Sequence, residues 1–148
     1  MDIEELLNDT LEEYLMEVVG DKVEDVAELP NMLKDISYLD NKEELIAKTD
    51  YCEILEPGDA EVEDCEEDDG DIHLTYVFDY IMQTFIKDDF IWRIQGTIRA
   101  ELTITDADSV DWSEFEDGDF DALYDKFKEL VRFDKVKYDF IECDTLYN

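Results

Sequence analysis

The residues that decide the fold are Ile72 to Ile104, which read IHLTYVFDYIMQTFIKDDFIWRIQGTIRAELTI. Apolar side chains occupy nearly every even position in two runs, about 72–86 and 90–104, and the odd positions of the second run are mostly polar. A period of two predicts strands with one buried face. The short polar joint at 87–89 between the two runs predicts an antiparallel β-hairpin.

The hairpin also has a predicted register. A three-residue loop pairs residues whose numbers add up to 176, which places Phe78 opposite Ile98 and Tyr80 over Gly96. Every apolar even position then meets another one. A slip by one residue would expose both apolar faces, so we expect this register to be strongly favoured.

Helical periodicity precedes the hairpin. Apolar residues from Ile3 to Val18 recur at spacings of three and four, which predicts an amphipathic helix that ends at Gly20. Shorter helical pieces are expected between residues 21 and 39. The stretch 44–55 fits a helix and a strand equally well, and both interpretations stay open.

A second helix pattern follows the hairpin at about 120–131, and an alternating pattern at 136–140 predicts a last strand. The order of helices, hairpin, helix and strand predicts an α+β fold, with helices packed on an antiparallel sheet. We expect residues 1–148 to form a single domain. Two strongly acidic stretches, about 56–71 and 105–119, are predicted to be mostly exposed loops, and a short edge strand around Val62 stays open within the first.

Charge is the most unusual property of the chain. Its 148 residues include 45 acidic and 12 basic side chains, which gives a formal net charge of −33. Binding a nucleic-acid backbone directly requires clustered Lys and Arg, so the composition argues against it. An anionic membrane surface is disfavoured for the same reason. A basic protein is the partner that such a chain attracts.

The cysteines and the first residues bear on the cellular compartment. An odd number of cysteines (Cys52, Cys65 and Cys143) predicts free thiols in a reducing compartment, with a Cys52–Cys65 disulfide as the alternative. The first residues are acidic, unlike the basic start of a secretory signal, and no run of 18 apolar residues occurs. We therefore expect a cytoplasmic protein.

The acidic residues are concentrated in three segments. On the first helix they lie opposite the apolar stripe at spacings of four, where like charges destabilise a helix by about 0.2–0.5 kcal/mol per pair. A helix that keeps this repulsion along one face either tolerates it for solubility or uses it in recognition. The candidate partner-binding residues are Glu5, Asp9, Glu12 and Glu13 in the first segment, Glu63, Asp64, Glu66, Glu67, Asp68 and Asp69 in the second, and Glu114, Glu116, Asp117 and Asp119 in the third.

In charge, size and composition the chain resembles the acidic DNA-mimic inhibitors that phages use against restriction and CRISPR enzymes. The resemblance implies an inhibitor that occupies the basic nucleic-acid-binding surface of a DNA- or RNA-processing or defence enzyme. It includes no family-specific motif, so no functional residue is carried over from the family.

Two other functions fit the same composition. An immunity, antitoxin or chaperone-type protein would use its charge to recognise a specific basic partner that need not bind nucleic acid. Alternatively, the charge serves solubility alone. A homodimer that extends the charged surface also stays open.

Motifs for catalysis, cofactors or metals are not found. The three calcium-like loops that begin at Asp64, Asp106 and Asp117 lack the glycine required at the sixth position. The chain has one histidine, His73, and neither a nucleophile motif nor a phosphate-binding loop. We therefore predict no catalytic residue, no cofactor and no dedicated metal site. His73 is interpreted as a surface residue, with a pH switch as the alternative.

Trp112 lies within the third acidic segment, together with Phe115. Two roles are open to this tryptophan. We favour the interpretation that both aromatic side chains hold the segment on the core, over one in which Trp112 anchors a partner.

Overall fold

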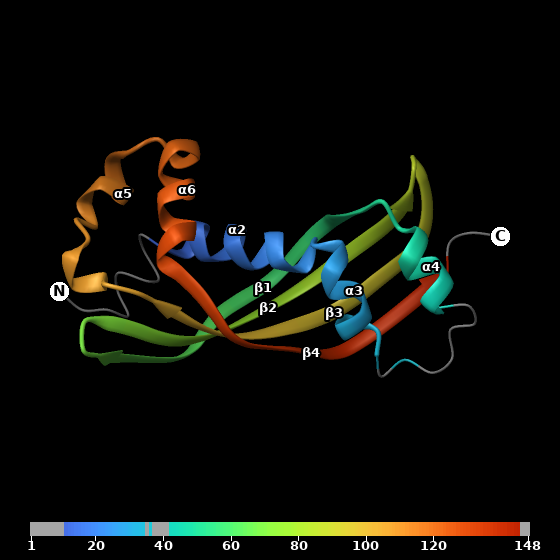
Figure 1. Cartoon of the computed structure of the whole chain (residues 1–148), viewed down its shortest axis with the longest axis horizontal. Helices are drawn as coiled ribbons and strands as arrows, with labels where there is room; N and C mark the ends of the chain where they lie inside the picture. Colours follow the sequence, from blue (N-terminus) through green and yellow to red (C-terminus); the bar gives the residue numbers. More distant parts are fainter. Residues whose placement is uncertain (1–10, 35, 37–41, 146–148) are drawn as a thin grey trace. The chain divides into compact units, whose positions relative to one another are not determined.

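The structure is a computed structural model that describes residues 11–34, 36 and 42–145. It contains helices and one four-stranded antiparallel sheet in the order β1-β2-β3-β4, which confirms the α+β prediction (Figure 1). The strands are β1 (Tyr51–Asp68), β2 (Asp71–Ile86), β3 (Asp89–Ile104) and β4 (Val131–Thr145). The helices are α2 (Glu12–Val23), α3 (Leu29–Met32), α4 (Lys42–Lys48), α5 (Ser113–Asp117) and α6 (Phe120–Leu130), with short 3-10 turns at Val26–Glu28 and Ala107–Ser109.

The predicted hairpin is confirmed as β2 and β3. The even residues of β2 from 72 to 84 and those of β3 from 92 to 104 are buried. Two contacts join residues whose numbers add up to 176: the amide of Trp92 donates to Oγ1 of Thr84 at 3.2 Å, and Oγ1 of Thr97 donates to Oδ1 of Asp79 at 2.6 Å. Both agree with the predicted register, although β3 begins at Asp89, so only two residues separate the strands.

The described residues group into two compact units. Unit 1 comprises 11–19, 60–77 and 100–136, and unit 2 comprises 20–59, 78–99 and 137–145. Each of the four strands contributes one part to each unit. The two units are described separately below, and the single domain stays a prediction.

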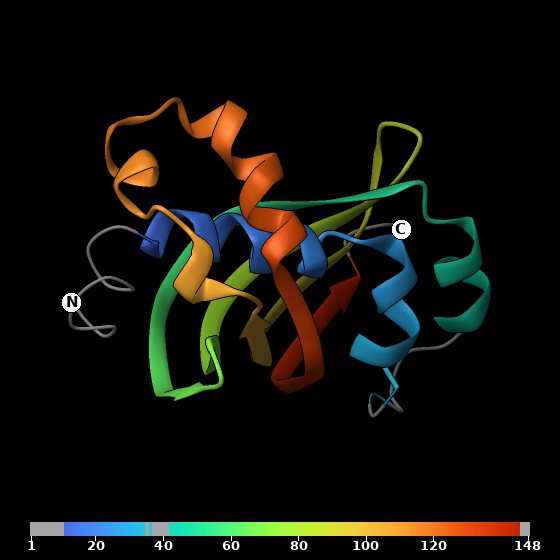
Figure 2. The same cartoon turned by 60° about the vertical axis from the view of Figure 1, so that its left-hand side comes forward.

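The core of unit 1 is built around Tyr14 of α2. Its ring stacks on Phe120 at a centroid distance of 4.6 Å and lies 5.4 Å from Phe127, and Phe115 meets it edge-on at 5.3 Å. Aromatic pairs at such distances stabilise a core beyond the area that they bury. These contacts join α5 and α6 to the first turns of α2. Figures 1 and 2 show all three helical segments on the same side of this part of the sheet.

The core of unit 2 contains the fully buried Trp92 and Tyr80. Beside it the Tyr138 hydroxyl of β4 donates a hydrogen bond to Oε1 of Glu28 at 2.9 Å. Nζ of Lys42 donates to the carbonyl oxygens of Leu33, at 2.9 Å, and of Ile36. This amine therefore links the start of α4 to the segment that follows α3.

The predicted helix end at Gly20 is wrong, because α2 continues to Val23. Gly20 is buried within the helix, and a Cβ atom there would lie 3.6 Å from Ile54 of β1. A contact of 3.6 Å is ordinary, so packing does not require a glycine here, and the helix continues past Gly20 to bury Val23. The ambiguous stretch 44–55 is divided: α4 occupies its beginning and β1 its end.

The predicted acidic loop at 56–71 is also wrong, because β1 runs through it to Asp68. The edge strand allowed around Val62 is present, but it is much longer than the short strand considered. Asp69 and Gly70 form the turn, with φ angles of +50° and +85°, and β2 follows at once. β1 pairs only with β2 in the sheet. An edge strand tolerates charged side chains on both faces, so it needs no alternating apolar pattern. The predicted exposure is confirmed for eleven of the sixteen residues, and the other five are half-buried.

The predicted loop at 105–119 contains a 3-10 turn and α5, so this prediction is wrong in part. Trp112 and Phe115 are 8% and 4% exposed, and Nε1 of Trp112 donates to the carbonyl oxygen of Ala107 at 3.2 Å. Both side chains therefore belong to the core, as favoured above. The helix predicted at 120–131 is confirmed as α6, and the last strand is confirmed but begins earlier, at Val131.

Candidate acidic interface

Carboxylates line the part of β1 that belongs to unit 1. Six of the eight residues from 61 to 68 are acidic, and all six are exposed. We call these side chains the acidic row: Glu61, Glu63, Asp64, Glu66, Glu67 and Asp68. Because β1 is an edge strand, this row borders the sheet on one side.

The acidic row is divided between the two faces of the sheet. The two-residue turn at 69–70 sets Asp68 opposite Asp71, so the even residues of the row share a face with His73 and Thr75. The odd residues share a face with the buried Ile72 and Leu74, on which the helices pack. Asp64, Glu66 and Asp68 therefore lie on the face opposite α5 and α6.

A cleft of about 270 Å³ opens on that face of unit 1. The backbone at Leu74 and Leu102 contributes to its wall, since both side chains are buried in the core. The polar side chains around it come from all four strands: Asp64 and Glu66 of β1, His73 and Thr75 of β2, Glu101 of β3 and Asp134 of β4. Four carboxylates and one imidazole thus surround the cleft.

His73 is held in the cleft by a chain of hydrogen bonds. Its Nδ1 atom lies 2.8 Å from Oγ1 of Thr103, and that hydroxyl donates to Oδ2 of Asp134. A hydroxyl has one hydrogen to donate, so Thr103 must accept from an Nδ1–H group. The neutral ring therefore carries its lone pair on Nε2, which lies 3.8 Å from Oδ2 of Asp68.

Asp134 is the best-stabilised carboxylate of the cleft. The hydrogen bond from Thr103 is the main cause that holds its pKa below the ordinary value, and burial opposes it. Arg132, whose Nε donates to Oδ1 at 2.8 Å, adds a smaller lowering. Asp134 is therefore ionised at neutral pH. The carboxylates of the cleft therefore give it a negative character.

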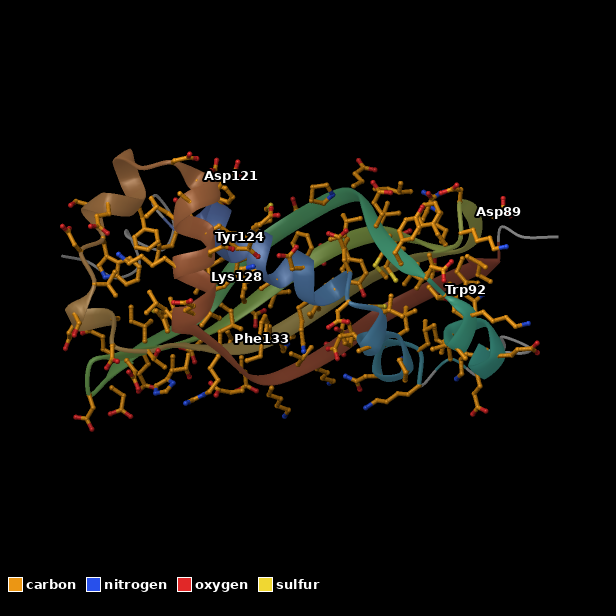
Figure 3. The ribbon with its side chains drawn as sticks, turned by 45° about the horizontal axis from the view of Figure 1, so that its top comes forward. Asp89, Trp92, Asp121, Tyr124, Lys128 and Phe133 are labelled. Carbon is orange, nitrogen blue, oxygen red and sulfur yellow. The ribbon has the colours of Figure 1, made fainter. Side chains whose placement is uncertain are left out.

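Cations of unit 1 pair with carboxylates of α5, α6 and β4. Lys126 lies 2.9 Å from Glu114, and Lys128 lies 3.3 Å from Asp125. Figure 3 shows Lys128 and Tyr124 on α6, where the amine lies 4.9 Å from the centre of the ring. Among the described ion pairs none includes Glu61, Glu66 or Glu67.

All described members of the three predicted clusters belong to unit 1. Glu12 and Glu13 are exposed in the first turn of α2, whereas Glu5 and Asp9 lie outside the described residues. The second cluster, residues 63–69, forms most of the acidic row and its turn.

The third cluster has partners within the protein. Glu114 pairs with Lys126, and Asp119 caps α6 by accepting from the amide of Asp121 at 3.2 Å. Glu116 and Asp117 are part of α5, and their side chains lie outside the described residues. A local structural role thus accounts for the two described members of this cluster.

Glu101, Thr103 and Asp134 were missed as site residues. The predicted register of the hairpin already sets His73 opposite Thr103, so the contact between these two residues could have been predicted from the sequence. Asp134 was not, because the sequence does not specify how β4 aligns with β3.

The described part of the chain contains no group of three or more His, Cys, Asp or Glu side chains arranged to hold a metal ion. Cys52, Cys65 and Cys143 form no disulfide, as predicted, and burial raises the pKa of Cys52 to about 12. No helix within the described ranges has the length and apolar character needed to span a membrane. Comparison with protein-family models, curated proteins and solved structures found no match.

Proposed function

We propose that the protein is a cytoplasmic, non-enzymatic inhibitor that occupies the basic nucleic-acid-binding surface of a DNA- or RNA-processing or defence enzyme. The acidic row is the observation that carries this proposal. Its carboxylates are exposed on an edge strand, and the sequence contains no Lys or Arg between Lys48 and Lys87. A basic groove of a partner can therefore approach the row without meeting a cation on the same segment.

The spacing of charge along the row supports a nucleic-acid mimic. A strand rises about 3.4 Å per residue, so residues 61–68 span roughly 24 Å. Six carboxylates over that length correspond to about one charge per 4 Å. One strand of a DNA duplex carries about one phosphate per 3.4 Å of axis, and the whole duplex carries twice that density. The row thus approaches the charge density of a single nucleic-acid strand.

Electrostatics also favours rapid capture of a basic partner. A net charge of −33 on 148 residues produces a strong long-range field. Such fields raise association rates by about 10–10³ and are screened by salt. We therefore expect inhibition that is fast at low ionic strength and weak at high ionic strength.

The test is a capture experiment with the full chain. The immobilised protein is offered a panel of purified nucleases and other nucleic-acid-binding enzymes, with single-stranded DNA, duplex DNA or raised salt as competitors. We expect a captured enzyme to be inhibited and to be released by DNA, most effectively by single strands. Capture that DNA does not affect would contradict the proposal and favour the immunity-type function.

A matched pair of variants separates position from net charge. Glu61, Glu67 and Asp68 are changed to Lys in one variant, and Asp121, Asp125 and Glu129 of α6 are changed to Lys in the other. Both variants gain the same charge at exposed positions. Only the β1 variant should lose capture, and equal loss in both would show that the acidic row has no special role.

A further inference from the structure

The cleft around His73 opens on the face of unit 1 opposite α5 and α6. Figure 2 shows these two helices together on one side of the sheet. The cleft is surrounded by carboxylates from three strands and contains no Lys or Arg in its lining. The His73 ring is positioned by Thr103, and in its neutral form Nε2 is a further hydrogen-bond acceptor. A face with these properties complements a cationic group that carries several hydrogen-bond donors.

We propose that this cleft accepts a single arginine side chain from a basic partner protein. The inference rests on the proposed function, which it deepens by naming the group that inserts. A volume of about 270 Å³ lies just below the range of small-molecule ligand pockets, which begins at about 300 Å³. One side chain fits this size better than a larger ligand does.

Arginine suits the arrangement better than lysine. Its planar guanidinium presents five donors in a fixed fork, whereas the lysine ammonium is a compact and strongly hydrated charge. The acceptors of the cleft are spread over the four strands, so one extended donor group can reach several of them. Asp134 is already held by Thr103 and Arg132, which leaves Asp64, Glu66 and Glu101 as the main carboxylate acceptors.

The experiment is an NMR titration of the full chain with short peptides that have blocked ends. The probes are Gly-Arg-Gly, Gly-Lys-Gly and the same peptide with citrulline, which has nearly the shape of arginine but no charge. We expect the arginine peptide to give saturable shifts at the His73 ring and at the Thr75 and Glu101 amides. Binding of the lysine and citrulline peptides should be weaker by roughly tenfold or more.

Two double variants on one strand control for net charge. Asp64→Asn with Glu66→Gln removes two carboxylates of the cleft and should abolish the saturable shifts. Glu61→Gln with Glu67→Gln removes two carboxylates that do not line it and should leave them unchanged. Equal binding of the arginine and lysine peptides, or equal loss in both variants, would overturn the inference.

The peptide titration does not require a captured enzyme, so it can fail or succeed separately from the capture experiment. Saturable arginine binding without capture that DNA reverses would contradict the proposed function and leave the cleft as an arginine site. Capture that DNA reverses without arginine binding would support the acidic row and refute the role of the cleft.

Discussion

The Nδ1 atom of His73 lies 2.8 Å from the Oγ1 atom of Thr103. Thr103 is fully buried and also donates to Asp134, so one hydroxyl joins β2, β3 and β4 in unit 1. Thr103→Val removes both hydrogen bonds with little change of shape. We predict that it lowers the free energy of unfolding by about 1–3 kcal/mol, because an ionised partner is involved.

The same substitution has a pH signature. The folded pKa of Asp134 is lowered, so its contribution to stability is present above about pH 4 and is lost as the pH falls through the folded value. The difference in urea midpoint between wild type and Thr103→Val should therefore be largest at neutral pH and smaller in acid. Thr97→Val, which breaks an exposed bond to Asp79, is the control and should cost only a few tenths of a kcal/mol. A loss for Thr103→Val that is equally small would contradict the prediction.

Two glycines should respond to alanine in opposite directions. Gly20 lies within α2, where an added Cβ would make an ordinary contact of 3.6 Å with Ile54. Alanine is the better helix former, so Gly20→Ala should stabilise the protein by about 0.5–1 kcal/mol. At Gly118 a Cβ would lie 2.5 Å from the carbonyl oxygen of Glu114 and closer still to Leu123. Gly118→Ala should therefore cost about 1–3 kcal/mol.

Thermal unfolding of both variants in the same buffer tests this pair. The wild-type chain is the common reference, and the sign of the change in melting temperature is the readout. Destabilisation by Gly20→Ala would mean that the packing between α2 and β1 differs from the structure.

The sequence predicts the hairpin well because burial imposes a period of two on both β2 and β3. Trp92 is fully buried on the predicted face, and Gly96 and Tyr80 are buried on it as well. This alternation of apolar and polar residues is long, and burial of one face of the hairpin is its main cause. Local propensity and tertiary packing therefore agree there, which is the condition under which sequence patterns are most informative.

β1 could not be found in the same way, because an edge strand covered with carboxylates has neither a regular apolar face nor a composition typical of strands. One signal was nevertheless present. Asp69-Gly70 is the kind of pair that occupies the two central positions of a hairpin turn, and both residues have positive φ angles here. A search for turn residues, rather than for periodicity, would have placed β1 beside β2.

The candidate site was predicted in part for related reasons. Charge clustering identified the acidic row, since runs of carboxylates are visible in any sequence. The cleft depends on Glu101 and Asp134, which lie 33 residues apart in strands that meet only in the folded sheet. The register between β3 and β4 brings these two residues together, and no pattern within either strand indicates that register.

The turn between β2 and β3 offers a gain in stability. Lys87 has a φ angle of +57°, a conformation that costs residues with a side chain about 1–2 kcal/mol. Lys87→Gly should relieve this strain and raise the free energy of unfolding by about 0.5–1 kcal/mol, after the larger entropy loss of glycine on folding is included. Lys87→Ala removes the same charge and keeps the strain. If both variants change the urea midpoint equally, the effect belongs to the lysine charge and the strain argument is wrong.

Two buried tyrosines, Tyr76 and Tyr80, and the half-buried Tyr138 should make the protein sensitive to alkali. Burial raises the pKa of Tyr76, Tyr80 and Tyr138, and Glu28 adds to the effect at Tyr138. A phenol with a raised folded pKa contributes stability that is fully present below its ordinary value of about 10 and is lost as the pH rises through the folded value. We therefore expect the urea midpoint to fall above about pH 10.

Absorbance at alkaline pH distinguishes these groups from the other tyrosines among the eight in the chain. At least three phenols should stay protonated until the circular dichroism signal of the fold is lost, because ionising them requires water to reach the core. Tyr138→Phe should reduce that number by one, and it should lower stability at neutral pH by about 1 kcal/mol through loss of the bond to Glu28. Ionisation of all eight phenols near pH 10 in a chain that is still folded would show that these side chains are accessible to water and would contradict the packing described for both units.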